Sequence, residues 1–184
     1  FGNTARTVVT SVDFARSSTK TTSAARPLLL DAQANYALST SEKLSFGLFK
    51  IPFSYENLAS STELDTINRA QVVEKLVPGR DIGSQGRDIG VQFSGVRERL
   101  DYFLGVFNGG GINASDDNGG KDLAARAVFR ATDALALGAS WYDGEAGASA
   151  TTHDRQGGEV SYRQGPWTVR GEYVSGKDGS IRAA

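Results

Sequence analysis

The side chains of this sequence that could act on a solute are arginines in segments of alternating polarity. Arg126 and Arg130 lie four residues apart, and Arg163 and Arg170 follow in two later segments, each on the polar side. Basic side chains clustered in this way can attract anions through their summed electrostatic potential. The carboxylates that could instead neutralise them are Asp122, Glu159 and Glu172. Two interpretations are therefore open, a wall that attracts anions or a wall of mixed charge.

A second candidate for anion binding is the stretch GRDIGSQGRDIG at residues 79–90, which contains the pentapeptide GRDIG twice. A glycine-rich loop that cradles nucleotide phosphates follows a strand and precedes a helix. Here a helical pattern comes first and a strand pattern begins at Ile89, so the nucleotide interpretation fails on that order. We interpret the stretch as a junction between a long loop and a strand, with Arg80 and Arg87 as candidate anion contacts.

Other kinds of chemistry have little support in the composition. The 20 basic and 21 acidic residues balance, so there is no electrostatic case for nucleic acid. The absence of cysteine excludes disulfides and thiolate metal sites, and the single histidine, His153, is expected on a loop surface. The stretch SDDNGGKD at 115–122 has a glycine where a calcium loop needs a ligand. We therefore predict no enzyme, no cofactor and no metal site.

Alternation of apolar and polar residues defines the elements that must position these side chains. In PLLLDAQANYAL the even-numbered positions from Leu28 to Leu38 are apolar, and the odd ones include Asp31, Gln33 and Asn35. A period of two residues predicts a strand with one wet face. The candidate strands are nine, at 7–14, 28–38, 43–48, 88–93, 100–107, 122–131, 135–142, 159–163 and 167–173.

The connections between these strands alternate in length. Short turns fall near 39–42, 96–99, 132–134 and 164–166, and longer loops fall near 15–26, 52–86, 108–121 and 143–157. In an antiparallel meander, all the long loops then lie at one end of the strands and all the short turns at the other. Outer-membrane barrels have this layout, whereas a soluble sandwich has no reason to sort its loops so regularly.

Aromatic residues on the apolar faces gather near both ends of the strands. Those beside the short turns are Tyr36, Tyr102, Phe129, Tyr162 and Trp167, and those nearer the long loops are Phe14, Trp141 and Tyr173. Two aromatic belts are expected where a barrel crosses the two membrane interfaces, although aromatic residues also favour strands in general. Charges on the opposite faces imply that those faces meet water, because charges rarely occupy a dry core unpaired.

Five segments carry a further signal: LLLDAQANYAL, LSFGLFKIPFSYENLASSTELDTINRA, the GRDIGVQFSG stretch at 86–95, YFLGVFNGGGINASDDNGGKDLAARAVFR and LALGASWYDG, which together cover roughly residues 28 to 144. These segments resemble the phosphate-selective porin O and P family of Gram-negative outer membranes. The resemblance implies a 16-stranded β-barrel channel, usually trimeric, that passes small solutes passively. Some members select phosphate or other anions through arginines and lysines that line the bore.

The segment at 52–86 is too long for a simple connection, and loops of this length in compact proteins are usually functional. Its apolar spacing predicts a helix within 61–77 that begins at Ser61 or Thr62 and ends before Pro78. In porins the comparable loop folds into the bore and narrows it. The basic residues that would then contact solutes are Arg69, Lys75 and Arg80. The alternative is a helical cap outside the mouth, whose basic residues are simply solvated.

Lys50 lies in LFKIPF, just before Pro52, which cannot donate to a strand ladder. In phase with Leu48, a lysine would face lipid, which is costly near the middle of the membrane. Either a bulge turns Lys50 inward or the side chain lies at the rim and snorkels. We favour the inward placement, which would make Lys50 a cation of the pore.

We therefore interpret residues 1–184 as part of a single all-β domain, an antiparallel transmembrane β-barrel of Gram-negative outer membranes. Because bacterial single-chain barrels have an even number of strands, we expect further strands beyond the nine, and GKDGSIRAA is expected to be a loop-like tail. The expected partners are outer-membrane lipid, two further copies in a homotrimer, and small inorganic anions. The alternatives are a soluble β-sandwich or jelly-roll binding module, and a plugged barrel with a structural or adhesive role.

Overall fold

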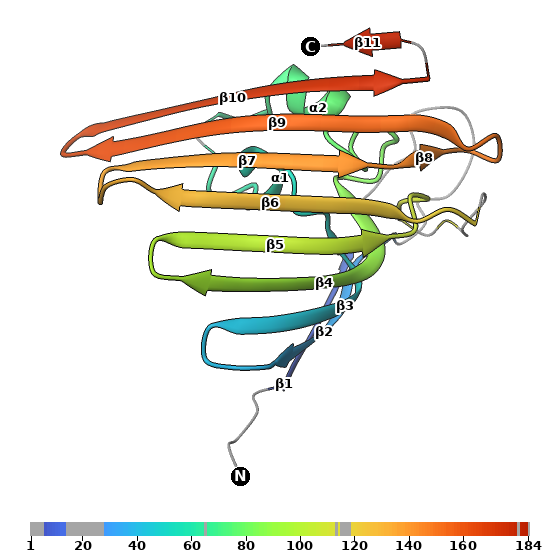
Figure 1. The fold of residues 1–184 in the computed structure, drawn as a ribbon, viewed down its shortest axis with the longest axis horizontal. Coiled ribbons are helices and arrows are strands. Elements are labelled where there is room, and N and C mark those ends of the chain that lie inside the picture. Colours follow the sequence, from blue (N-terminus) through green and yellow to red (C-terminus); the bar gives the residue numbers. More distant parts are fainter. Residues whose placement is uncertain are drawn as a thin grey trace.

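The computed structural model describes residues 6–13, 28–64, 66–112, 114, 119–179 and 181–183, and its strands form a single curved antiparallel meander (Figure 1). The strands are β1 (Arg6–Asp13), β2 (Leu28–Ala37), β3 (Glu42–Lys50), β4 (Arg87–Arg97), β5 (Leu100–Phe107), β6 (Asp122–Arg130), β7 (Leu135–Asp143), β8 (Glu145–Ala146), β9 (Thr151–Gln164), β10 (Trp167–Asp178) and β11 (Ile181–Ala183). The sheet order is β1-β2-β3-β4-β5-β6-β7-β9-β10-β11, with β8 paired to β9. The nine predicted strands correspond to β1–β7, β9 and β10.

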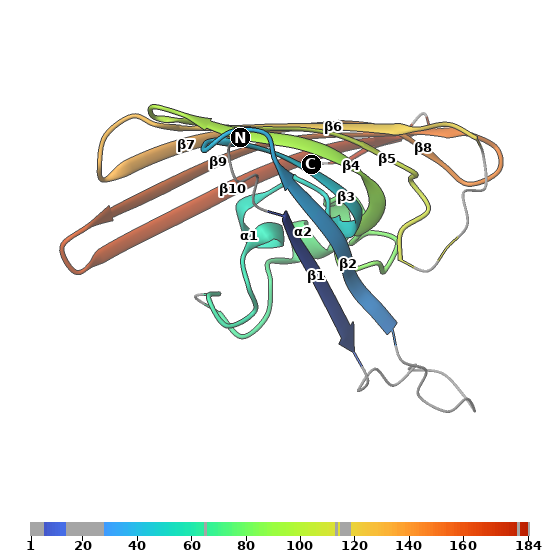
Figure 2. The ribbon, with the colours of Figure 1, turned by 90° about the horizontal axis from the view of Figure 1, so that it is seen from below.

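Among the described residues, the longer connections lie at one end of the strands and the short turns at the other, as the sequence predicts, and the loop predicted at 15–26 lies outside the described residues. Short turns follow β2, β4, β6 and β9, while β3 and β4 are joined by the longest connection among the described residues. The sheet is curved, and the two helices, α1 (Tyr55–Leu58) and α2 (Gln71–Leu76), lie on its concave side (Figure 2). Among the helices within the described ranges, none is long and apolar enough to cross a membrane.

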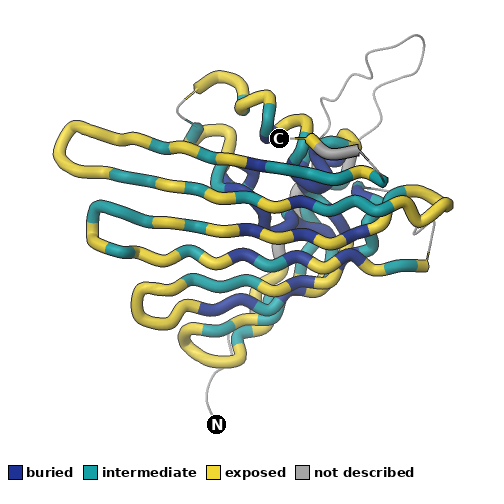
Figure 3. The backbone as a smooth tube through the Cα atoms, turned by 45° about the horizontal axis from the view of Figure 1, so that its top comes forward, coloured by how far each residue is buried: buried dark blue, intermediate teal, exposed yellow. Residues whose placement is uncertain are grey.

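The alternation of side chains along the strands is visible in their burial (Figure 3). On the convex side, apolar side chains are widely exposed, and Leu104, in the middle of β5, is 55% exposed. On the concave side, polar residues such as Ser45, Gln92 and Ser140 are buried. This arrangement is the reverse of a water-soluble sheet, and it suits a convex surface that meets lipid.

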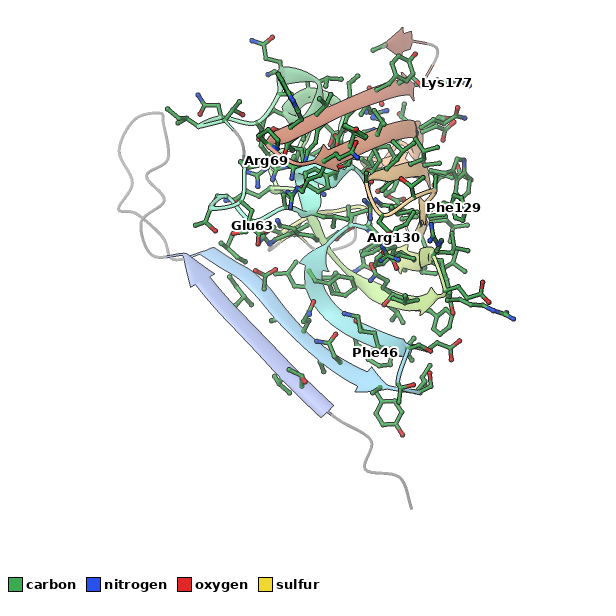
Figure 4. All side chains as sticks on the ribbon, turned by 90° about the vertical axis from the view of Figure 1, so that its left-hand side faces the viewer. Phe46, Glu63, Arg69, Phe129, Arg130 and Lys177 are labelled. Carbon is green, nitrogen blue, oxygen red and sulfur yellow. The ribbon has the colours of Figure 1, made fainter. Side chains whose placement is uncertain are left out.

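The aromatic residues of the predicted belts include several on this exposed apolar surface. Those exposed beside the short turns are Tyr36, Phe129 and Trp167, and those exposed toward the other end are Trp141 and Tyr173. Phe14 lies outside the described residues. Figure 4 shows Phe129 and Arg130, neighbours in β6, on opposite sides of the sheet. The strand therefore separates an aromatic side chain from a charged one.

The concave face carries a hydrophobic cluster, which corrects the expectation that this whole face meets water. The sheet contributes Phe49, Phe107, Ala124, Tyr142 and Val174, and the segment after β3 contributes Ile51, Phe53, Val73 and Val77. Phe107, which interrupts the polar pattern of β5, packs edge-on against Phe49 with ring centroids 5.6 Å apart. The interruption is explained because the β3–β4 segment, rather than water, covers this part of the sheet.

The predicted helix within 61–77 is wrong in extent. Only Gln71–Leu76 is helical, with Ala70 at the N-cap position and no side-chain cap, so neither Ser61 nor Thr62 begins it. The helix ends before Pro78, as expected. Val73 packs into the hydrophobic cluster, whereas Ile67 is 100% exposed. A short helix depends on such packing, so the apolar spacing upstream of residue 70 had nothing to stabilise it.

Two further boundaries differ from expectation. β9 begins at Thr151, so the loop predicted at 143–157 is shorter, and the ladder of β9 with β10 continues to the pair His153–Asp178. The tail GKDGSIRAA is not a simple loop, because its first residues belong to β10 and β11 pairs back onto them. Polar, glycine-rich sequence hid both extensions, since they carry no apolar alternation.

Candidate functional site

The connection between β3 and β4 lies against the concave face and is held there by wall residues. Ser54 Oγ donates to Glu172 Oε2 of β10 at 2.7 Å, and the backbone N–H of Glu56 donates to Glu172 Oε1 at 2.8 Å. At the far end of α2, Arg155 Nε of β9 donates to the carbonyl of Leu76 at 2.9 Å. The position of this segment is thus set by two strands distant from it in sequence.

Four basic residues gather around α1, and we call Lys50, Arg69, Arg80 and Arg87 the α1 basic cluster. Lys50 Nζ donates to the carbonyls of Leu58 and Ala59 at 3.1 and 2.9 Å. Arg69 donates from Nε to the carbonyl of Glu56 and from Nη2 to that of Ala59, each at 3.0 Å. Figure 4 shows Arg69 on the concave side. Lys50 and Arg69 therefore share one acceptor, which brings their positive charges together.

The other two members of the cluster are bound to carboxylates. Arg80 is buried, donating to Asn57 Oδ1 at 2.8 Å and to Glu74 Oε1 at 2.6 Å. Burial lowers the pKa of the Arg80 guanidinium, and the charges of Arg69 and Arg87 lower it further against the opposing effect of Glu74. A guanidinium nonetheless stays charged. The lowered pKa of Arg80 therefore reflects its burial first and the neighbouring positive charges second.

The two copies of GRDIG have different environments. Arg80, from the first copy, is buried in the turns that follow α2. Arg87, from the second, opens β4 and makes a bidentate pair with Asp31 of β2, at 2.9 and 3.0 Å. The ladder of β3 with β4 runs in continuous register from Glu42 to Lys50, so the bulge proposed to redirect Lys50 is not present. Lys50 is instead the last residue of its strand and meets the returning segment there.

The arginines of the strands are placed as follows. Arg126 is buried in β6, forms an ion pair with Glu159 of β9, and lies 5.7 Å from the centroid of the Phe103 ring. Arg130 forms an ion pair with Asp101 and is partly exposed. Arg170 of β10 lies 4.7 Å from the centroid of the Tyr55 ring. Arg163 is exposed on β9, and Lys75 is exposed in the last turn of α2.

Of the three carboxylates expected to neutralise these arginines, Glu159 forms an ion pair with Arg126, and the other two form hydrogen bonds with other elements. Glu159 pairs with Arg126, whereas Glu172 binds the β3–β4 segment. Asp122 accepts from the Tyr142 hydroxyl and from the backbone N–H of Glu145 at 3.0 Å. Glu172 therefore holds the β3–β4 segment, and Asp122 joins β6 to Tyr142 of β7 and Glu145 of β8, which the spacing of charges in the sequence could not reveal.

Two open pockets on the concave side adjoin the basic residues. One of about 220 Å³ is lined by Lys50 and Lys43 together with Asp31, Gln33, Gln92 and Phe103. Another of about 490 Å³ lies between the β3–β4 segment and β10, lined by Tyr55, Glu56, Leu64, Val72 and Arg170. The first pocket therefore combines two lysines, one carboxylate and two amide side chains.

Sequence reasoning missed the buried Arg155, whose side chain is 1% exposed. It contacts Asp81 at 3.0 Å and Asp178 at 2.8 Å. His153 was expected on a loop surface, but it lies in β9 with Nε2 3.0 Å from Asp81 and Nδ1 2.8 Å from Asp178. The two partners come from the β3–β4 segment and from β10, so the spacing of residues gave no sign of the network. Asp88 was also missed, and it accepts from the backbone N–H groups of Gly109 and Gly111.

The stretch SDDNGGKD lies largely outside the described residues. Within the part of the chain that the structure describes, no group of three or more potential ligands is arranged to hold a metal ion. What the concave face offers instead is fixed charge beside open space. Such an arrangement can attract or repel a passing ion without forming or breaking bonds.

Comparison with known proteins agrees with this geometry. Residues 9–166 match the family described as phosphate-selective porin O and P. No curated protein and no solved structure matches the chain. The match covers most of the meander, including the β3–β4 segment on the concave face and the exposed apolar convex face. The chain therefore belongs to the phosphate-selective porin O and P family of outer-membrane channel proteins.

Proposed function

We propose that the concave face lines a water-filled channel through which small solutes diffuse passively, and that the channel prefers small anions. The observation that carries this proposal is the bonding of Lys50 and Arg69, which donate to the backbone carbonyls of α1. Among the described residues, no ion pair joins either side chain to a carboxylate. Their positive charge is therefore left to act on the space beside them.

The size of this effect follows from Coulomb's law. Two unit charges about 4 Å apart interact by about 1 kcal/mol in bulk water and about 4 kcal/mol at the effective dielectric constant of about 20 found near protein surfaces. The interaction energy in a narrow passage beside the β3–β4 segment lies between these limits, and salt weakens the interaction further. Two closely placed cations then give a preference of several-fold for anions over cations.

The wall arginines add less to this preference than their number implies. Arg126 and Arg130 are paired with Glu159 and Asp101, so each pair is nearly neutral at a distance. The channel we propose therefore has one cationic region, around α1, and a wall of mixed charge elsewhere. Inorganic phosphate is a candidate solute of such a region, together with other small anions. We further propose assembly as a homotrimer in the outer membrane, the usual arrangement of the family.

Planar-bilayer recording tests the proposal. The protein, expressed from its own gene and purified in detergent, should give conductance steps and a reversal potential of anion sign in a KCl gradient. Replacing Lys50 and Arg69 together by Gln should move that potential toward zero, because it removes two cations that have no ion pair among the described residues. Arg99→Gln, in the exposed β4–β5 turn, is the control and should leave it unchanged.

Three outcomes would count against the proposal. A reversal potential of cation sign would refute the anion preference, and an unchanged value in the double variant would remove Lys50 and Arg69 from the conducting path. A complete absence of conductance would instead favour a plugged barrel, the second candidate, which the hydrophobic cluster on the concave face supports.

Added phosphate should reduce the chloride current if phosphate occupies the same region. Cross-linking in detergent tests the trimer.

A further inference from the structure

We propose that Glu172 of β10 is a positioning residue that sets the anion preference from a distance, by holding α1 so that Lys50 and Arg69 present their charges together. This inference rests on the proposed function. It assigns to an acidic residue on the concave face a role opposite to the one its charge suggests, because a carboxylate in a channel by itself favours cations.

The carboxylate of Glu172 binds the start of α1 with both oxygens. Oε2 accepts from the Ser54 hydroxyl at 2.7 Å and Oε1 from the backbone N–H of Glu56 at 2.8 Å. Ser54 Oγ in turn accepts from the N–H of Asn57 at 3.2 Å, which closes the first turn of the helix. These bonds fix the beginning of α1 to β10 in both position and direction. Charge-assisted bonds of this kind are stronger than neutral ones.

The end of α1 holds the cations. The carbonyls of the last turn of a helix have no partner within the helix, and they are available to donors from outside. Here those of Leu58 and Ala59 accept from Lys50, and Arg69 also binds Ala59. In the sheet order, β4, β5, β6, β7 and β9 lie between β3, which carries Lys50, and β10. The helix, which lies on the concave side of the sheet (Figure 2), thus connects an anion on one strand to a cation on a distant strand.

The backbone at Ser54 shows that this arrangement is held against strain. Ser54 has φ 67° and ψ 140°, in a region that side-chain-bearing residues rarely adopt. Such a conformation persists only where its surroundings enforce it. The surroundings here are Glu172 from β10 and Ser140 from β7, whose Oγ accepts from the Ser54 N–H at 3.4 Å. Loss of the Glu172 contacts would therefore let the segment relax away from its present path.

Two effects of removing the Glu172 charge oppose each other, and this makes the inference testable by sign. Deleting a negative charge beside a channel should by itself increase the anion preference. Releasing α1 should decrease it, because the cations move away from the ions that pass. At an effective dielectric constant of about 20, moving a cation of the protein from about 4 Å to about 6 Å from a passing anion lowers the occupancy of that anion site about tenfold. Salt screening reduces this to a few-fold.

The experiment compares Glu172→Gln with Asp101→Asn in planar bilayers under a KCl gradient. Asp101 is a matched control, since it is a strand carboxylate that pairs with Arg130 and has no bond to the described residues of the β3–β4 segment. We expect the ratio of anion to cation permeability to fall a few-fold in Glu172→Gln and to rise in Asp101→Asn. A rise in both variants would overturn the positioning role, while leaving the proposed function intact.

A neutral variant keeps the inference testable if Glu172→Gln fails to fold. Ser54→Ala removes one of the two hydrogen bonds that join α1 to Glu172, together with the Ser54 Oγ bond to Asn57 N, without changing any charge. It should lower the permeability ratio in the same direction by a smaller factor. The double variant should resemble Glu172→Gln alone, because both changes break one connection. An unchanged ratio in Ser54→Ala would overturn the inference. A wild-type channel without anion preference would refute the proposed function itself, which is a separate result.

Discussion

Arg155 offers the sharpest test of how the β3–β4 segment is held on the concave face. Its guanidinium lies 3.0 Å from Asp81 in that segment and 2.8 Å from Asp178 in β10, and its Nε binds the Leu76 carbonyl. The Arg155 side chain is 1% exposed, Asp81 is 9% exposed and Asp178 is 55% exposed. Replacing Arg155 by Met fills a similar volume but leaves Asp81 buried without its guanidinium partner.

The magnitude follows from this asymmetry. Breaking a buried ion pair by removing one partner costs about 3–5 kcal/mol, because an uncompensated charge stays behind. Asp178 is half exposed and can be hydrated again, so most of the loss comes from Asp81. His153 Nε2 remains 3.0 Å from Asp81 and limits that loss. We therefore expect the free energy of unfolding to fall by about 3 kcal/mol, at the lower end of the range.

Urea unfolding in lipid vesicles, followed by the fluorescence of Trp141 and Trp167, measures this change. Arg99→Met is the matched control, because its partner Asp133 is fully exposed, and no measurable change is expected. The double variant Arg155→Met with Asp81→Asn should recover much of the loss, since no buried charge is then left. A loss below about 1 kcal/mol for Arg155→Met, or no recovery in the double variant, would refute the reasoning.

Two further predictions concern the two faces of the sheet. Leu104→Arg, on the exposed apolar face in the middle of β5, should lower the free energy of unfolding in membranes by about 2–4 kcal/mol. Ser161→Arg, in β9 on the opposite face of the sheet, is the control and should be tolerated. Equal effects of the two variants would mean that the two faces are misassigned. Replacing Arg126 and Arg130 together by Glu should shift the reversal potential toward cations, because each change leaves two carboxylates where an ion pair stood. An unchanged reversal potential would show that the two arginines do not face the conducting path.

Strand identity and sheet order could be predicted because both depend on local pattern. A two-residue period places every second side chain on one face, and short turns force neighbouring strands to pair. β2 and β7 illustrate this, since each has a continuous alternation that needs no information from the rest of the chain. β11 and the first residues of β9 were missed because their polar, glycine-rich sequence has no such alternation.

The path of the β3–β4 segment depended on contacts that no local pattern encodes. The helical spacing from Leu64 to Leu76 was real, but only the part that reaches the hydrophobic cluster is helical. Phe107 interrupts the polar face of β5, and its contact with Phe49 in the tertiary structure explains why an aromatic residue occupies this position. A packing contact stabilises the fold only when both residues are in place, so it cannot be predicted from the position of one residue in the sequence.

The sequence by itself determined the meander, the sorting of loops to one end, the separation of apolar and charged faces, and the set of basic residues available to a solute. Tertiary structure alone decided which of those residues are neutralised. Arg126 meets Glu159 and Arg87 meets Asp31, while Lys50 and Arg69, among the described residues, donate to carbonyls of α1 and of Ala59 at its end. The reason is physical, because a charge acts through distances of a few ångströms. Those distances are set by how strands curve and loops fold, over separations that the order of residues does not record.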